Sequence, residues 1–216
     1  MAEFINTIDL LGDDAVVDGI IDKTIMEFKD NVITIVEQYA FSRCANLRIV
    51  DLPNVTTANS YAFEACTSLT EINIPKCSSA ARSIFNSCTS LKKIVLPAVT
   101  SIINETASNT GYLAGCTSLE YVDMLVITSI GGRCFNGCTA LTTLAIRTNT
   151  VASLVSTNAF SNTPIAKGTG YVYVPRSLVD SYKAATNWST YANQFRAIED
   201  YTVDGTITGE LDETKI

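Results

Sequence analysis

Apolar residues recur along the middle of this chain in a pattern whose period changes within each copy. In one copy Phe63, Cys66 and Leu69 follow one another at three-residue steps, and Ile72 and Ile74 then alternate with polar residues. Steps of three are typical of a helical or 3₁₀ turn with one apolar edge, whereas alternation is typical of a strand. Each copy therefore predicts a tight turn followed by a short strand.

The pattern occurs in five full copies, most of them 22 residues apart, and in a sixth, degenerate copy around Phe160 and Thr163. After each predicted strand, a β-branched run such as Ile127–Ile130 could form a second short strand. Units of this size cannot bury an apolar interior alone, so they must stack. The sequence predicts a solenoid of about six coils, with short parallel β-strands and short helical or 3₁₀ turns. The five full copies fall at Phe41, Cys44 and Leu47; Phe63, Cys66 and Leu69; Phe85, Cys88 and Leu91; Leu113, Cys116 and Leu119; and Phe135, Cys138 and Leu141.

Two of the spacings between copies are longer than the others. Six extra residues fall around Ile103–Gly111, and three fall around Arg147–Ser156. Insertions in solenoids bulge from one face and often lie near binding surfaces. Each insertion could equally be a plain extension of a loop.

The two ends of the chain are expected to cap the solenoid, because an uncapped coil would stack on other molecules. The stretch Asp13–Lys23 predicts a short helix with its acidic residues near the N-terminus. Ser177 is a candidate N-cap for a C-terminal helix. Trp188 is expected to pack against the last coil, the alternative being a residue that stacks on a ligand. The predicted boundaries are 1–30 for an acidic N-terminal cap, 31–175 for the solenoid, 176–200 for a helical cap and 201–216 for a terminal strand, hairpin or tail.

Charge is concentrated at the ends of the chain. The net charge is −7, with −6 in residues 1–30, −4 in residues 196–216 and +3 between them. No basic stripe could follow a phosphate backbone, so nucleic-acid binding is not expected. No stretch approaches the roughly 18 apolar residues of a membrane-spanning helix, so membrane insertion is not expected. The acidic N-terminus lacks the basic and apolar regions of a secretory signal.

All seven cysteines fall at positions that suit a small core residue. Five share one position of the repeat, while Cys77 and Cys134 stand where other copies have small or apolar residues. Free cysteine behaves as a small buried hydrophobe. We therefore expect seven reduced, buried thiols, neither paired in disulfides nor bound to a metal.

The sequence offers little for catalysis. It has no histidine, which removes the usual general base and the Ser-His and Cys-His pairs. The acidic residues from Asp13 to Asp22 have the spacing of a solvated helix face and not of a calcium loop. No catalytic residue, cofactor or metal is therefore expected, and the chain is not expected to be an enzyme. An enzyme that works through carboxylates is the weakest alternative.

The repeat resembles that of the BspA-like leucine-rich repeat family, whose coil reads approximately A-F-x-x-C-x-x-L-x-x-[IV]-x-[IL]-P-x-[VI]-T-x-I. Residues 61–80 and 132–146 follow it closely, and the resemblance covers about 32–175. The segment 171–188 is similar to C-terminal segments of such proteins from gut bacteria and their prophages. The sequence departs from the pattern at Leu113, which replaces Phe, and at Leu125 and Arg147, which replace Pro.

This resemblance implies a leucine-rich-repeat solenoid that works in adhesion at a cell surface and binds proteins of a host or of bacteria. It carries no catalytic residues over to this chain. A structural protein of a phage or prophage virion, in a tail or receptor-binding assembly, is the alternative, since such a protein needs no secretory signal. An extracellular, cell-surface or virion location is favoured over the cytoplasm.

The alternation within the strands indicates which side chains face outward together. Tyrosines beside carboxylates suit a protein or glycan partner, because tyrosine offers a large amphipathic area at small entropic cost. The alternative is that an exposed sheet tolerates tyrosine as a good strand former. The termini could also attach to other subunits. The candidate partner-binding residues are Ile49, Asp51, Glu71, Asn73, Lys93, Val95, Tyr121, Asp123, Thr143, Tyr171 and Tyr173, with Ala145 in the same outward column.

Overall fold

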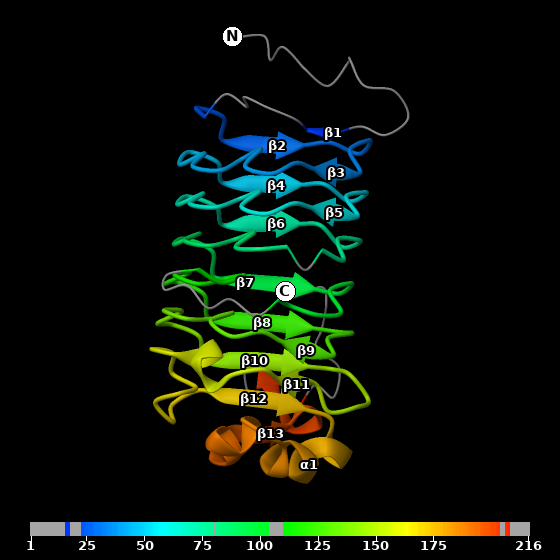
Figure 1. Cartoon of the computed structure of the whole chain (residues 1–216), viewed down its shortest axis with the longest axis vertical. Coiled ribbons are helices and arrows are strands. Elements are labelled where there is room, and N and C mark those ends of the chain that lie inside the picture. The colour runs from blue at the N-terminus through cyan, green and yellow to red at the C-terminus, as the bar shows by residue number, and fades with distance from the viewer. Residues whose placement is uncertain (1–15, 18–22, 80, 104–109, 204–205, 208–216) are drawn as a thin grey trace.

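The computed structural model describes residues 16–17, 23–79, 81–103, 110–203 and 206–207. Over these residues the chain forms a stack of short coils, with helices at its C-terminal end (Figure 1). Each coil of the repeat region contributes a tight turn and one front strand. The predicted leucine-rich-repeat solenoid is therefore confirmed.

The front strands lie side by side along one side of the stack, and we call their outer surface the strand face (Figure 1). They form two parallel sheets, one of three strands and one of five. In register, each strand residue pairs with the residue at the same repeat position in the next coil, as Ile49 does with Glu71. The three-stranded sheet contains β2 (Glu27–Lys29), β4 (Ile49–Asp51) and β6 (Glu71–Asn73), and the five-stranded sheet contains β7 (Lys93–Leu96), β8 (Tyr121–Met124), β10 (Thr143–Ile146), β12 (Tyr171–Val174) and β13 (Phe195–Ala197).

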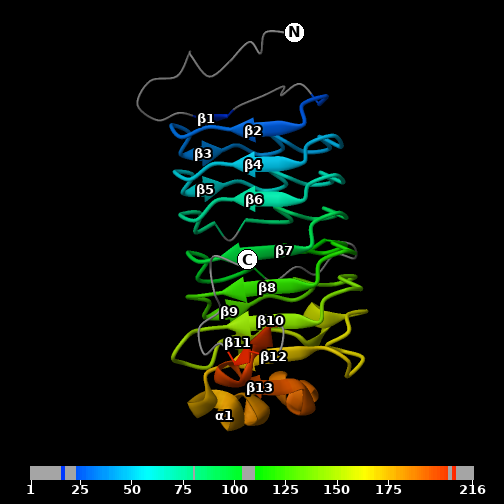
Figure 2. The ribbon, with the colours of Figure 1, turned by 180° about the vertical axis from the view of Figure 1, so that it is seen from behind.

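The β-branched run of several coils forms a second, shorter strand, as expected (Figure 2). These strands make two small parallel sheets, and a single bridge joins Ser101 to Ser129. Their bounds are β1 (Val16–Val17), β3 (Ile35–Val36) and β5 (Thr57–Ala58) in one sheet, and β9 (Ser129–Ile130) and β11 (Ser153–Leu154) in the other.

The three-residue steps of the repeat are successive tight turns. The N–H of Cys44 donates to the carbonyl of Phe41 at 3.1 Å, and the N–H of Leu47 donates to that of Cys44 at 3.1 Å. Turns of neighbouring coils are also bonded to each other, since the Ala65 N–H donates to the Asn86 carbonyl at 2.7 Å. Ala65 has a φ of 55°, a left-handed conformation that the glycine at the same repeat position, Gly137, adopts without strain.

The core is a set of columns that run along the stack. The rings of Phe41 and Phe63 stack at 5.1 Å between centroids, and those of Phe63 and Phe85 at 5.5 Å. The column changes at Leu113, where the ring next to Phe85 is instead that of Tyr112, edge-on at 5.7 Å. All of these side chains are buried, so each coil covers the interior of the next.

The five cysteines at one repeat position form a second column, and all seven cysteines are buried free thiols, as the sequence predicted. The Cys66 Sγ donates to the carbonyl of Phe41 at 3.1 Å, and Cys88, Cys116 and Cys138 make the same bond one coil further along each time. Burial raises the pKa of the Cys66 thiol to about 12. Burial also raises the pKa of Cys77, Cys88, Cys116, Cys134 and Cys138. These thiols are therefore protonated and unreactive near neutral pH.

The C-terminal cap has the predicted helix, but its start differs from the prediction. Ser177 lies inside a 3₁₀ turn and is not an N-cap, because the residue before the α-helix is Leu178, which makes no side-chain cap bond. Trp188 is fully buried and donates to the carbonyl of Ala152 at 2.7 Å, which confirms its packing role. The cap elements are the 3₁₀ helices Arg176–Leu178, Trp188–Gln194 and Ile198–Asp200 and the α-helix α1 (Val179–Ala184), while another 3₁₀ helix, Thr157–Phe160, belongs to the last repeat.

The two ends of the described chain form short strands. In the tail, β14 (Thr202–Val203) pairs antiparallel with β15 (Thr206–Ile207), a pairing that fits one of the forms left open for this segment. Val16–Val17 is a strand paired with β3, where the sequence predicted helix. A short valine pair can extend the ladder of the first coil, and pairing there outweighs the weak helical pattern. The remaining residues of the expected N-terminal helix, apart from Lys23, lie outside the described residues.

The buried thiol column predicts how the cysteines react. In the native protein a thiol-specific reagent should label none of the seven cysteines, and after unfolding in guanidinium it should label all seven. A Ser181→Cys variant supplies the control, because this exposed position should react at once. Fast labelling of a native cysteine, or fewer than seven labels after unfolding without reductant, would contradict the assignment.

Candidate binding surface

The strand face is interrupted between β6 and β7. In the other repeats the amide of the first strand residue donates to the preceding coil, as Glu71 does to the Arg48 carbonyl at 3.1 Å and Tyr121 to the Lys92 carbonyl at 3.2 Å. The equivalent bond would join the N–H of Lys93 to the carbonyl of Thr70, and it is absent from the described residues. The two sheets therefore face each other here with unpaired edges, and β6 and β7 stand visibly apart in Figures 1 and 2.

The same two coils remain joined at their turns. The Phe63 N–H donates to the Ile84 carbonyl at 2.9 Å, and the Thr89 hydroxyl donates to the Thr67 carbonyl at 3.3 Å. The stack is therefore continuous on the turn side and open on the strand face.

The interior residues near the interruption are unusually large. The residue before the repeat phenylalanine is Ala62 in the coil of β6, whereas Ile84 and Tyr112 take this place in the next two coils. Both larger side chains are buried, and the Tyr112 hydroxyl reaches back to donate to the Ser79 carbonyl at 3.2 Å. Close-packed interiors transmit added volume to the backbone. We attribute the interrupted ladder to this added volume.

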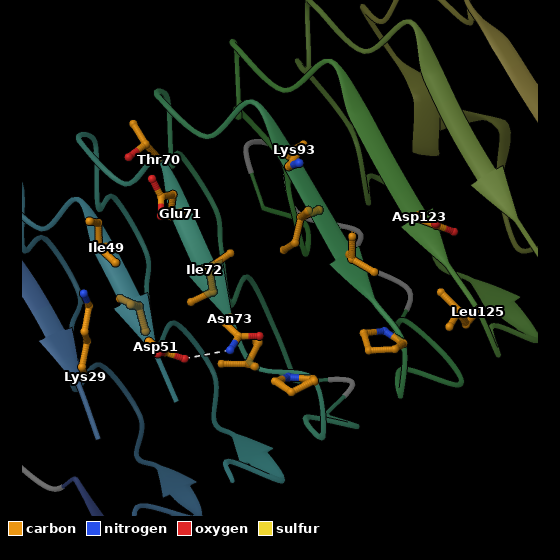
Figure 3. Close-up of a pocket in the computed structure, with 16 residues that line it drawn as sticks. Lys29, Ile49, Asp51, Thr70, Glu71, Ile72, Asn73, Lys93, Asp123 and Leu125 are labelled. Carbon is orange, nitrogen blue, oxygen red and sulfur yellow. Dashed lines mark hydrogen bonds between the residues drawn. The ribbon is translucent and has the colours of Figure 1, made fainter. Parts of the chain in front are cut away.

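An open hollow of about 930 Å³ lies over the strand face from β2 to the end of β8 and includes the interruption, and we call it the β6–β7 groove (Figure 3). Ile72 of β6 lies along it and is only half-buried, although Val50 and Ile94 at the same repeat position are 1% and 2% exposed. Val95 and Pro75 add further apolar surface to the lining. The volume falls in the range of sites that bind small ligands or short peptides.

Charged side chains flank this apolar lining. Glu71 lies on β6 and Lys93 on β7, both exposed, and neither side chain makes a hydrogen bond or salt bridge within the described residues. Burial lowers the pKa of Lys93, and the negative charge of Glu71 partly offsets that effect. Asp51 is already engaged, because it accepts a bond of 2.7 Å from the Asn73 side chain (Figure 3).

Asp123 differs from the prediction, because it is buried and not exposed. Its carboxylate accepts three bonds of 2.9–3.0 Å from the guanidinium of Arg147, and the Tyr121 hydroxyl donates to it at 3.3 Å. Arg147 stands where the repeat usually has proline and can therefore fold back over the sheet. Ala145 is buried as well, because it lies in register between Asp123 and Tyr173, whose larger side chains cover its methyl group.

A cluster of tyrosines lies further along the strand face. Tyr171 and Tyr173 of β12 are edge-to-face at 6.4 Å, and Tyr201 from the C-terminal segment contacts Tyr173 at 4.7 Å and Tyr121 at 6.4 Å. The guanidinium of Arg196 lies 4.4 Å from the centre of the Tyr171 ring. Burial raises the pKa of Tyr121 and of Tyr173, so both hydroxyls are protonated near neutral pH.

The predicted partner-binding residues therefore fall into two groups. One group lines the β6–β7 groove, and the other consists of the three strand tyrosines. We call these three residues, together with Tyr201 and Arg196, the tyrosine cluster. Thr143 of β10 is half-buried and pairs in register with both Tyr121 and Tyr171. Tyr201 and Arg196 were missed, because they lie outside the repeat and no periodicity places them. The groove-lining predicted residues are Ile49, Asp51, Glu71, Asn73, Lys93, Val95 and the buried Asp123.

No group of three or more acidic, cysteine or histidine side chains in the described ranges is arranged to hold a metal ion. Within the same ranges, no helix has both the length and the apolar character needed to cross a bilayer.

The buried ion pair predicts a specific loss of stability. Arg147→Ala leaves the Asp123 carboxylate, whose side chain is 2% exposed, without its partner. We expect the free energy of unfolding at neutral pH to fall by about 3 kcal/mol, measured by guanidinium denaturation. The matched control is Arg176→Ala, which breaks the exposed pair with Asp200 and should change stability little. Equal effects of the two substitutions would show that Arg147 does not stabilise the strand face.

Known proteins share the repeat and the stacked-coil architecture of this chain. The family described as BspA type leucine rich repeat region matches in six copies, over residues 21–125 and 108–178. A leucine rich cell surface protein from Faecalibacterium prausnitzii A2-165 has a similar solved structure, with a TM-score of 0.52 and 25% identity over 69% of this chain and 43% of that chain. A leucine-rich repeat protein from Bacteroides ovatus ATCC 8483 aligns with a TM-score of 0.41 and 24% identity over 69% of this chain and 49% of that chain. No curated protein matches significantly.

This chain spans less than half the length of either solved protein. The family match, in contrast, extends over most of this chain and coincides with the stacked coils. The protein belongs to the BspA-type leucine-rich repeat family.

Proposed function

We propose that the protein is a non-enzymatic interaction module that binds a protein or a glycan at a cell surface through its strand face. Leucine-rich repeats generally act as binding modules, because stacked coils present an extended surface on a rigid frame. The solved relative from Faecalibacterium prausnitzii is described as a cell surface protein, which supports an extracellular or surface location for this chain as well.

The observation that carries this proposal is the tyrosine cluster. Three strand tyrosines and Tyr201 meet on one face, and each is only partly buried. The short parallel strands hold the rings in place, so little side-chain entropy remains to be lost on binding. Rigid aromatic rings beside a guanidinium form the kind of surface at which binding energy concentrates.

The composition of the cluster suits both classes of partner. The ring faces of Tyr171 and Tyr173 can pack against apolar patches of a protein or of a sugar ring, and their hydroxyls can donate to carbonyl or sugar oxygens. Arg196 adds donors, although it already lies over Tyr171. The carboxylate of Asp123, next to Tyr121, is paired with Arg147.

A capture experiment tests the proposal. The purified protein should retain a partner from surface extracts of candidate host cells, and the variant Tyr121→Ala/Tyr171→Ala/Tyr173→Ala should lose about tenfold or more of that retention. The matched control is Tyr39→Ala/Tyr61→Ala, which removes a stacked tyrosine pair from the turn side of the solenoid. Circular dichroism checks that all proteins are folded.

Equal capture by the wild type and by the strand-face variant would place the binding surface elsewhere. Loss of capture in the turn-side variant alone would have the same meaning. Failure of the wild type to retain any partner would contradict the proposed function.

A further inference from the structure

The two strand edges that face the β6–β7 groove carry unpaired backbone groups. By the pattern of the other coils, the N–H of Lys93 and the carbonyl of Thr70 should bond to each other, and within the described residues neither does. Backbone donors and acceptors at a sheet edge form a template for another extended chain. An extended peptide provides the complementary groups along both of its edges.

The side chains beside these edges define what such a chain must look like. A strand in this place would have one residue in register with Glu71 and Lys93, and its next residue would be in register with Ile72 and Ile94. The first residue would point outward, and the second would point into the solenoid. Because Ile72 is half-buried where its equivalents are fully buried, an apolar side chain at the inward-pointing position of the peptide would complete the core.

The charged side chains beside the outward-pointing position restrict the peptide sequence further. Glu71 on one side can only accept hydrogen bonds, and Lys93 on the other can only donate. The negative charge of Glu71 acts on Lys93, but no side-chain hydrogen bond or salt bridge of either residue is present within the described residues. An Asn or Gln side chain donates and accepts at once, so a single amide between them complements both charges.

We propose that the β6–β7 groove binds an extended peptide segment, which enters as an additional parallel or antiparallel strand between β6 and β7. The segment alternates polar and apolar residues, with an amide side chain between Glu71 and Lys93. This inference rests on the proposed function and narrows it, because it assigns a polypeptide to the groove and leaves the tyrosine cluster to contact the rest of the partner.

The test is a selection from a phage-displayed library of random eight-residue peptides against the purified protein. The selected peptides are then synthesised, and their dissociation constants are measured by titration against two variants. Lys93→Pro removes the edge N–H together with the charge, and proline is tolerated at the first residue of a strand when its nitrogen does not face the pairing partner. Lys93→Ala is the matched control, because it removes the charge and keeps the N–H.

The proposal predicts enrichment of alternating peptides with an amide residue. Lys93→Pro should raise their dissociation constant about tenfold or more, and Lys93→Ala should raise it by a clearly smaller factor. Methylation of the peptide backbone nitrogens should abolish binding. If no peptide is enriched, or if Lys93→Pro binds as tightly as Lys93→Ala, strand addition is wrong. A glycan that binds in the groove equally well to both variants would also overturn it.

These outcomes are independent of the capture experiment. If capture through the tyrosine cluster succeeds while no selected peptide depends on the Lys93 N–H, the peptide groove fails and the proposed function stands. If peptides bind as predicted but no surface partner is captured, the cell-surface function fails and the groove stands.

Discussion

The hydrogen bonds and ring contacts between successive coils are the constraint on which the rest of this structure depends. A coil of this repeat has no core of its own, and it becomes stable only when its phenylalanine and cysteine are covered by the next coil. The bonds from Cys66 to the Phe41 carbonyl and from Ala65 to the Asn86 carbonyl show how closely neighbouring coils must match. Because each coil repeats the same contacts, the fold itself carries little functional information. The informative features are the places where the repetition changes.

Two such places shape the strand face. Larger interior residues at Ile84 and Tyr112 coincide with the loss of the Lys93 bond, and a groove opens there while the turns stay joined. At the other end, the C-terminal cap adds Tyr201 and Arg196 to tyrosines that the strands already present. One site thus arises from a gap between two coils and the other from what packs onto the last ones. Together they make one face of the stack differ from the otherwise regular repeat.

Much of this arrangement could be predicted from the sequence, because repetition converts a local pattern into tertiary contacts. The inward positions of the front strands from Val50 to Val174, other than Ile72, and the buried thiols follow from periods of three and two. The burial of Asp123 did not follow, since it depends on where Arg147 folds, and alternation cannot show that. The groove does have a signal in the sequence, namely Ile84 and Tyr112 in place of alanine, but the pattern alone does not show that this added volume opens the ladder. Tyr201 left none, because it lies outside the repeat.

Amide hydrogen exchange followed by NMR tests the central claim, that the ladder of the strand face is interrupted between β6 and β7 alone while the turns remain bonded. The account predicts rapid exchange at the Lys93 amide, and slow exchange at Tyr121 on the neighbouring strand and at Ala65 on the turn side of the same junction. Protection of Lys93 equal to that of Tyr121 would show that the two sheets are continuous in solution, and the groove would then not exist as a binding surface.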